Sequence, residues 1–145
     1  MLGGIITLFG EKPPFKKDKT KKYILMIEDD GDLAEMYKMK LEKEGFAVLL
    51  SRNGKQGLKD IRDIRPDLVL LDILMDKKDG FDVLAEIQKC PLPHVKNVPI
   101  IVLTNLTSPS DQEEGKRLGA RDWWVKAHNT PAEVASKVKK FLKKA

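Results

Sequence analysis

Six polar residues with chemically useful side chains stand at the ends of short apolar runs. They are Glu28, Asp29 and Asp30 after YILMI, Asp72 after LVLL, Thr104 after IIVL, and Lys126 after DWWV. A buried carboxylate such as Asp72 is costly unless it protonates or finds partners. Carboxylates held close together repel one another unless a cation lies among them, and hard oxygen ligands suit Mg²⁺. A lysine and a hydroxyl opposite them could bind the oxygens of a phosphoryl group, with Asp72 as the nucleophile.

The elements that must position these residues alternate along the chain. Runs typical of buried strands cover residues 22–28, 46–51, 67–72, 98–104 and 122–126, and helical patterns cover 32–45, 54–64, 80–89, 110–119 and 130–144. Strands that alternate with helices in this way predict an α/β fold with a parallel sheet covered on both faces. In such sheets functional groups gather at the carboxyl ends of the strands, which is where the six polar residues stand.

Local signals predict how two of the helices begin. Asp32 followed by Glu35 resembles a capping box, and Thr130 before Pro131 is typical of a helix start. An apolar stripe is expected on the helix at 32–45, made of Leu33, Met36, Tyr37, Met39 and Leu41.

Composition and charge narrow the class of protein. The chain of 145 residues predicts one domain, and its single cysteine, Cys90, excludes an internal disulfide. No cysteine and histidine spacing suggests zinc, and a reducing, cytoplasmic setting is expected. The net charge of +5 divides into +4 for residues 1–22, −4 for 23–136 and +5 for 137–145. The basic ends are predicted to be solvated, with contact to an acidic partner or an anionic surface as the alternative.

The amino-terminal segment is predicted to be an extension. The stretch MLGGIITLFG is apolar but too short to span a bilayer, and it lacks the features of a signal peptide. A basic, proline-containing linker follows it. We therefore expect an extension over residues 1–22, a domain over 23–145, and no transmembrane segment.

Taken together, residues 22 to 144 resemble a receiver domain of the two-component response regulators. The motifs that carry the resemblance are ILMIEDDGDL, PDLVLLDILMDKKDGFDVL, PIIVLTN and GARDWWVKA. The resemblance implies a flavodoxin-like (βα)5 doubly wound parallel sheet with strand order 2-1-3-4-5.

The resemblance also implies a role for each site residue. Asp72 would be the phosphoacceptor, and Thr104 and Lys126 would contact the phosphoryl oxygens. The resemblance further implies a Mg²⁺ site made of Asp29, Asp72, the backbone carbonyl of Leu74 and, through water, Glu28. Thr104 and Trp123 would form the switch, with Trp123 in the place of the family's usual tyrosine or phenylalanine.

Three positions depart from the family pattern. Asp76 stands where proline is usual, which predicts a looser and more acidic loop. Asn105 replaces a small residue and would crowd the phosphoryl site. Ala127 follows the lysine where the family has a proline joined through a cis bond, and a cis bond to another residue costs about 3 kcal/mol.

The function expected from these residues is that of a single-domain, chemotaxis-type response regulator. It would accept a phosphoryl group on Asp72 from a histidine kinase or a histidine phosphotransfer protein. No output domain follows residue 145, so we expect no direct DNA binding and a signal that leaves by protein contact. The contact face would be formed by residues 110–119, 122–126 and 130–144.

Alternatives to this function remain at this point. One is a receiver-like binding module that works without phosphorylation, favoured by Asn105 and Ala127. A more distant one is a phosphatase of the haloacid dehalogenase type, which would need a second aspartate where Leu74 stands. We expect no enzyme activity beyond self-phosphorylation and self-dephosphorylation. The resemblance implies that the residues two positions after Asp72 and Thr104 flank the path of the attacking water. Here they are the apolar Leu74 and Leu106, which predicts a long-lived aspartyl phosphate.

Overall fold

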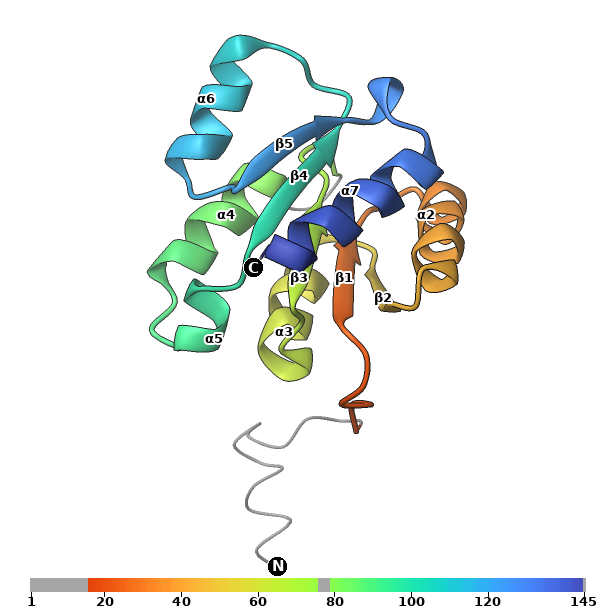
Figure 1. Ribbon diagram of the computed structural model, residues 1–145. Helices are drawn as coiled ribbons and strands as arrows, with labels where there is room; N and C mark the ends of the chain where they lie inside the picture. The colour runs from red at the N-terminus through yellow and green to blue at the C-terminus, as the bar shows by residue number, and fades with distance from the viewer. Residues whose placement is uncertain (1–15, 76–78, 145) are drawn as a thin grey trace, which may run out of the picture.

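The computed structural model describes residues 16–75 and 79–144 (Figure 1). The strands are β1 (Tyr23–Ile27), β2 (Ala47–Ser51), β3 (Leu68–Leu71), β4 (Ile100–Thr104) and β5 (Asp122–Val125). The α-helices are α2 (Gly31–Lys43), α3 (Gly54–Ile64), α4 (Gly80–Lys89), α5 (Pro93–Lys96), α6 (Pro109–Arg117) and α7 (Pro131–Lys144). A 3₁₀ turn, η1, covers Lys126–His128. The predicted apolar start of the chain and Asp76 lie outside the described residues.

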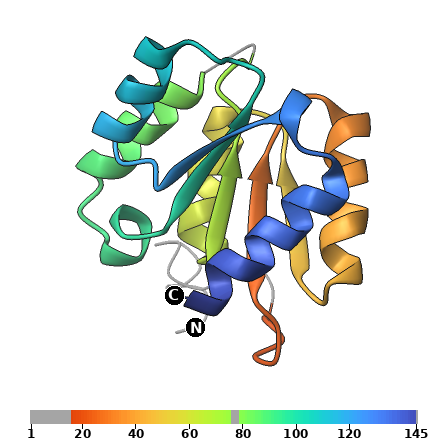
Figure 2. The ribbon, with the colours of Figure 1, turned by 45° about the horizontal axis from the view of Figure 1, so that its top comes forward.

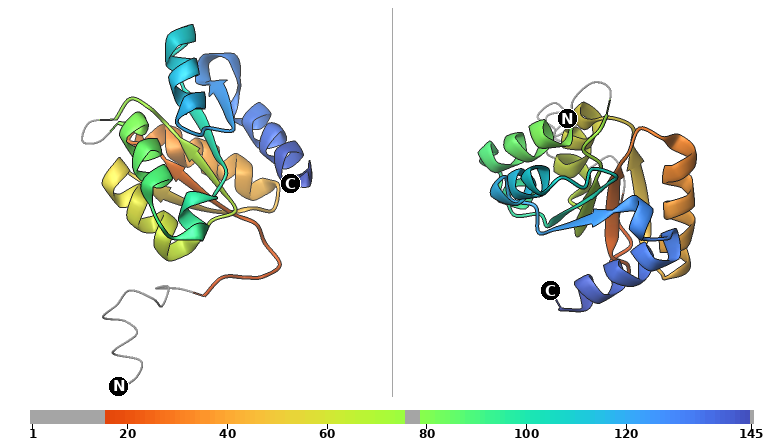
Figure 3. Two further views of the ribbon diagram at one scale, coloured as in Figure 1. Left: turned by 90° about the vertical axis from the view of Figure 1, so that its left-hand side faces the viewer. Right: turned by 90° about the horizontal axis from the view of Figure 1, so that it is seen from above.

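The five strands form one parallel sheet in the order β2-β1-β3-β4-β5, which confirms the predicted topology. Helices cover both faces of this sheet (Figure 2). α2 and α7 pack on one face, whereas α3, α4 and α5 pack on the other, with α6 beside α4 and β5. The view from above shows the sheet between these two helical layers (Figure 3).

The side chains of β1 alternate between two separate hydrophobic cores, one on each face of the sheet. Ile24 and Met26 face α2 and α7, while Leu25 and Ile27 face α3 and α4. All four side chains are at most 1% exposed. Strands that are buried on both faces read as continuous apolar runs, which is why β1, β3 and β4 were recognisable from sequence.

The first helix begins differently from the sequence prediction. Asp30 and not Asp32 is its N-cap, because the carboxylate of Asp30 accepts a hydrogen bond from the Leu33 amide at 3.1 Å. The predicted apolar stripe is also partly wrong, since Met36 and Met39 are 54% and 59% exposed. The side chains of this helix that are buried are Ala34, Tyr37 and Leu41.

The last helix begins as the sequence predicts. Thr130 Oγ1 accepts a hydrogen bond from the Glu133 amide at 3.1 Å, and Glu133 Oε1 accepts one from the Thr130 amide at 2.8 Å. This reciprocal pair is a capping box, and Pro131 occupies the first helical position. The short helix α5 was not predicted, and the fifth strand ends at Val125, one residue earlier than expected.

The linker before β1 is held against the edge of the sheet where the strands begin. The Asp18 amide donates to the Tyr23 hydroxyl at 2.6 Å, and the Lys17 ammonium donates to the carbonyl of Arg65. The Tyr23 amide in turn donates to Asp67 Oδ2 at 2.7 Å. Within the described ranges, no helix is long and apolar enough to cross a bilayer.

Candidate functional site

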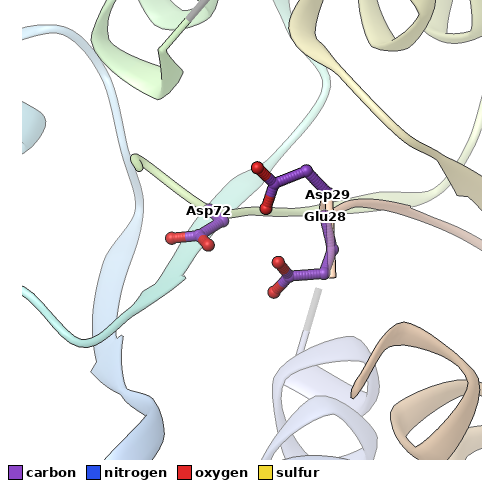
Figure 4. A group of neighbouring side chains, drawn as sticks. All are labelled: Glu28, Asp29 and Asp72. Carbon is purple, nitrogen blue, oxygen red and sulfur yellow. The ribbon is translucent and has the colours of Figure 1, made fainter. Parts of the chain in front are cut away.

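Three carboxylates converge at the edge of the sheet where the parallel strands end. Glu28 and Asp29 follow β1, and Asp72 follows the neighbouring strand β3. One carboxylate oxygen from each lies within 4.8 Å of the others. Figure 4 shows the three side chains next to one another, with Glu28 and Asp29 directed toward Asp72. The sequence therefore predicted correctly that these residues meet, because strand ends of a parallel sheet share one edge.

The carboxylate of Asp72 is buried and accepts three hydrogen bonds. Its side chain is 7% exposed, and Oδ2 accepts from the Lys126 ammonium at 2.9 Å. Oδ1 accepts from the amides of Ile73 at 2.7 Å and Leu74 at 3.4 Å. These hydrogen bonds offset part of the desolvation cost of a buried carboxylate.

Lys126 is shared between two buried carboxylates. Its ammonium lies 2.5 Å from Glu28 Oε1 as well as 2.9 Å from Asp72 Oδ2, and its side chain is 10% exposed. Burial raises the pKa of Glu28, and the charge of Asp72 raises it further against the opposing effect of Lys126. Burial alone would lower the pKa of Lys126, but the hydrogen bonds to Glu28 and Asp72 outweigh it and raise that pKa.

The loop after β5 places Lys126 without a cis bond. All peptide bonds among the described residues are trans, and the Ala127 amide donates to Asn105 Oδ1 at 2.9 Å. Asn129 Nδ2 donates to the carbonyl of Val125 at 2.8 Å on the other side of the 3₁₀ turn. Asn105 thus contacts the backbone of the lysine loop, a role that sequence reasoning missed. Asn129 was missed as well, although an asparagine before a helix is a usual signal for local backbone hydrogen bonds.

Thr104 and Trp123 lie on adjacent strands. Thr104 is fully buried at the end of β4, and its hydroxyl accepts from the Leu106 amide at 3.4 Å. Trp123 is half-buried on β5, where its indole Nε1 donates to the Leu106 carbonyl at 3.0 Å. Its ring also lies 6.3 Å from that of Phe81 on α4. Trp123 is therefore connected through Leu106 to the segment that begins at Thr104.

Leu74 lies in the loop after β3, next to the acidic edge. Its side chain is 58% exposed, whereas that of Leu106 after β4 is half-buried. Both apolar side chains follow residues of the site by two positions. The Leu74 carbonyl has no described contact, so its role as a metal ligand stays a prediction.

The donor set fits a small divalent cation such as Mg²⁺. Three carboxylates with oxygens this close carry more negative charge than the single ammonium of Lys126 can neutralise. Among the described residues, no other cationic side chain forms an ion pair with these three carboxylates. Oxygen ligands of this kind suit Mg²⁺.

This fold and its acidic edge agree with the resemblance to a receiver domain. The family model of the response regulator receiver domain matches residues 24–139, which is most of the chain. The protein therefore belongs to the response regulator receiver domain family.

Curated relatives share this domain and are longer. The DNA-binding response regulator MtrA of Mycobacterium tuberculosis is 35% identical over 127 residues, which cover 88% of this chain and 53% of MtrA. The transcriptional regulatory protein CpxR of Escherichia coli is 35% identical over 122 residues, which cover 84% of this chain and 50% of CpxR. The chain thus spans about half the length of these relatives.

Solved structures share the fold over nearly their whole length. The chemotaxis protein CheY4 of Vibrio cholerae has a TM-score of 0.75 at 26% identity, covering 83% of this chain and 98% of CheY4. The signal receiver domain of a signal transduction histidine kinase from Syntrophus aciditrophicus has a TM-score of 0.74 at 31% identity. That alignment covers 86% of this chain and 92% of the receiver domain.

Proposed function

We propose that this protein accepts a phosphoryl group on Asp72 from a histidine kinase or a histidine phosphotransfer protein. The observation that carries the proposal is the position of Asp72. Its carboxylate is buried at a strand end, contacts Lys126 at 2.9 Å, and lies within 4.8 Å of two further carboxylates. A structural carboxylate needs no such acidic surroundings, whereas a carboxylate that attacks a phosphoryl group with the help of Mg²⁺ needs further carboxylates to hold that ion.

The proposed reaction forms one bond and breaks one. A carboxylate oxygen of Asp72 attacks phosphorus, and the bond from phosphorus to the donor's imidazole nitrogen breaks. The imidazole leaves with the electron pair of that bond. It leaves as neutral imidazole when its other nitrogen is protonated, and otherwise it takes up a proton from water. Lys126, already within hydrogen-bonding distance of Asp72, turns to a phosphoryl oxygen, and the hydroxyl of Thr104 donates to another.

A bound Mg²⁺ would supply positive charge to the phosphoryl oxygens, and Asp29, Asp72 and, through water, Glu28 would hold it. The chain's own residues still provide the orientation. The Ile73 and Leu74 amides fix one oxygen of Asp72 by hydrogen bonds at 2.7 and 3.4 Å. Positioning of this kind accounts for much of the catalysis of phosphoryl transfer.

The proposal is tested with acetyl phosphate and Mg²⁺, followed by intact-protein mass spectrometry. One phosphoryl group should be added to the parent protein and none to the Asp72→Asn variant. Asp79→Asn is the matched control, because Asp79 caps α4 nearby and should leave labelling intact. Equal labelling of the parent and the Asp72→Asn variant would show that Asp72 is not the acceptor.

The alternatives considered above have less support. The departures at Asn105 and Ala127 favoured a module that works without phosphorylation, yet Lys126 contacts Asp72 and Glu28 despite them. A phosphatase of the haloacid dehalogenase type would need a carboxylate at position 74, where an exposed leucine stands. We further propose that the chemistry of this domain is confined to its own Asp72.

The signal is proposed to leave through the face formed by α6, β5 and α7. Trp123 lines a cavity of about 300 Å³ on this face, together with residues of α6 and of the segment before β5. The indole is tied to Leu106, which lies two residues after Thr104. A movement of Thr104 toward a phosphoryl group would therefore reach this face through one hydrogen bond.

A further inference from the structure

A groove of about 350 Å³ lies between α2 and the loop that joins β5 to α7. α2 and α7 pack side by side, and the 3₁₀ turn η1 leads toward the start of α7 (Figure 2). The apolar lining of the groove includes Leu33 and Met36 of α2. Its polar lining includes Tyr37 of the same helix, Asn105 after β4 and Lys126 of η1. The groove therefore combines apolar walls with polar groups from three separate segments.

This groove adjoins the phosphoacceptor. Lys126 lines it and donates to Asp72 Oδ2 at 2.9 Å. Asn105, also in its wall, directly follows Thr104, whose hydroxyl is proposed above to contact a phosphoryl oxygen. A small molecule in the groove would thus lie beside a phosphoryl group that is being transferred to Asp72.

The hydroxyl of Tyr37 is an unused hydrogen-bonding group in the wall of the groove. The Tyr37 side chain is 2% exposed, yet its hydroxyl forms no hydrogen bond with any other residue that the structure describes. Among the described residues every fully buried polar side-chain atom has a partner, so this hydroxyl must reach open space. The space that Tyr37 lines is the groove, and the hydroxyl is therefore available to whatever occupies it.

The surroundings of Tyr37 keep this hydroxyl protonated. Burial raises the pKa of Tyr37, and the charges of Glu28 and Asp72 raise it further against the opposing effect of Lys126. At neutral pH the hydroxyl is therefore a donor. Since all three charged groups act on it, the hydroxyl also lies in the electrostatic surroundings of the phosphoacceptor.

Asn105 and Lys126 add further donors to the groove. Asn105 Oδ1 accepts from the Ala127 amide at 2.9 Å, and a backbone N–H can only donate, so the nitrogen Nδ2 points away from that amide. Nδ2 forms no hydrogen bond with the described part of the chain. The ammonium of Lys126 likewise has only donors. Three donors in one groove suit a ligand that presents acceptor oxygens.

The chemistry of transfer to Asp72 indicates which ligand this is. The attacking and leaving atoms lie roughly in line, so the leaving group points away from Asp72. An acyl phosphate leaves as a carboxylate, which takes the electron pair of the broken bond and needs no proton. Donors such as a hydroxyl or an amide stabilise the negative charge that develops on its oxygens. A protonated phosphoimidazole presents an N–H instead and matches these donors less well.

We propose that this groove receives the leaving group of a small acyl phosphate, with the Tyr37 hydroxyl donating to a carboxylate oxygen. The inference rests on the proposed function, because it takes Asp72 as the acceptor. A carboxylate oxygen of Asp72 forms a bond to phosphorus while the bond from phosphorus to the acyl oxygen breaks. The protein would thus take phosphoryl groups directly from a small metabolite of this class as well as from a protein donor.

The test compares initial rates of phosphorylation by acetyl phosphate and by phosphoramidate, each with Mg²⁺ and followed by intact-protein mass spectrometry. Phosphoramidate leaves as ammonia and offers no carboxylate oxygen. The Tyr37→Phe variant should lose about tenfold in kcat/KM with acetyl phosphate and stay within about twofold of the parent with phosphoramidate. Carbamoyl phosphate, which leaves as carbamate with a similar pair of oxygens, should lose rate as acetyl phosphate does.

The matched control is Tyr23→Phe, which removes a hydroxyl at the start of β1, far from the groove, and should keep all three rates. Equal losses with phosphoramidate and acetyl phosphate in Tyr37→Phe would overturn the proposal, since Tyr37 would then act on the site in general. Unchanged rates with all three donors would also overturn it, and so would a loss confined to acetyl phosphate. If the parent is not labelled at Asp72 by any donor, the proposed function fails and this inference fails with it.

Discussion

The hydrogen bond between Asn105 and Ala127 should position the lysine of the site. Asn105 Oδ1 accepts from the Ala127 amide at 2.9 Å, one residue beyond Lys126. The Asn105→Ala variant removes this acceptor and leaves the rest of the loop, including the bond from Asn129 to Val125, in place. The loop after β5 should then hold Lys126 less tightly between Asp72 and Glu28.

The size of the effect follows from the exposure of Asn105. A net hydrogen bond contributes about 0.5–1.5 kcal/mol to stability, and an exposed one belongs in the lower half of that range. The free energy of unfolding should fall by about 0.5–1 kcal/mol, which lowers Tm by about 1–4 °C for a chain of this size. If all of that free energy served to place Lys126, the rate of phosphorylation by acetyl phosphate would fall by at most about fivefold.

Two measurements and one control test whether Asn105 positions Lys126. Thermal unfolding reports the hydrogen bond, and the initial rate of phosphorylation reports the placement of Lys126. The control is Asn97→Ala, which changes another exposed asparagine at the opposite edge of the sheet. A variant with lowered Tm but the parental rate would refute a role for Asn105 in positioning Lys126. An equally slow Asn97→Ala variant would show that the change in rate is not specific.

Three further predictions concern the metal, the switch and the lifetime of the signal. Asp29→Asn should weaken Mg²⁺ binding in calorimetry by more than about tenfold, since even outer-shell changes at metal sites cost that much; unchanged affinity would remove Asp29 from the site. Beryllofluoride with Mg²⁺ should change the tryptophan fluorescence of the parent and of the Trp124→Phe variant, but hardly that of the Trp123→Phe variant. A response that is lost in Trp124→Phe and kept in Trp123→Phe would contradict the assignment of Trp123 as the switch. The double variant Leu74→Asn, Leu106→Glu should dephosphorylate about tenfold faster. A polar side chain that orients water needs to stabilise the transition state by only about 1.4 kcal/mol for this effect. Decay at the parental rate would show that the leucines do not shield the aspartyl phosphate.

The fold was predictable because its three central strands, β1, β3 and β4, are buried on both faces. In a short chain with alternating helical segments, apolar runs such as LVLL are recognised as buried strands. The ends of these strands then locate Asp72 and Thr104. The surface of α2 was less predictable. Met36 and Met39 are as apolar as the buried Leu41 but are exposed, and apolar type alone does not decide which side of a helix is covered.

The position of Lys126 in the site could not be predicted from any single residue of the sequence. In the sequence, Asn105 and Ala127 are two separate departures from the family pattern, and each suggested a defective site. In the structure they are partners, joined across the ends of β4 and β5. A contact between residues that lie 22 positions apart becomes visible only once the register of the two strands is known.

The departures at Asn105 and Ala127 are therefore best explained together, as the two partners of one hydrogen bond. A proline at position 127 would have no amide hydrogen, so Asn105 would have nothing to accept from it. A small apolar residue at position 105 would leave the Ala127 amide without this acceptor. With both residues present, a trans bond suffices to bring the Lys126 ammonium to 2.9 Å from Asp72. The side chain of Asn105 is also engaged by this contact, which gives an asparagine at this position a structural reason.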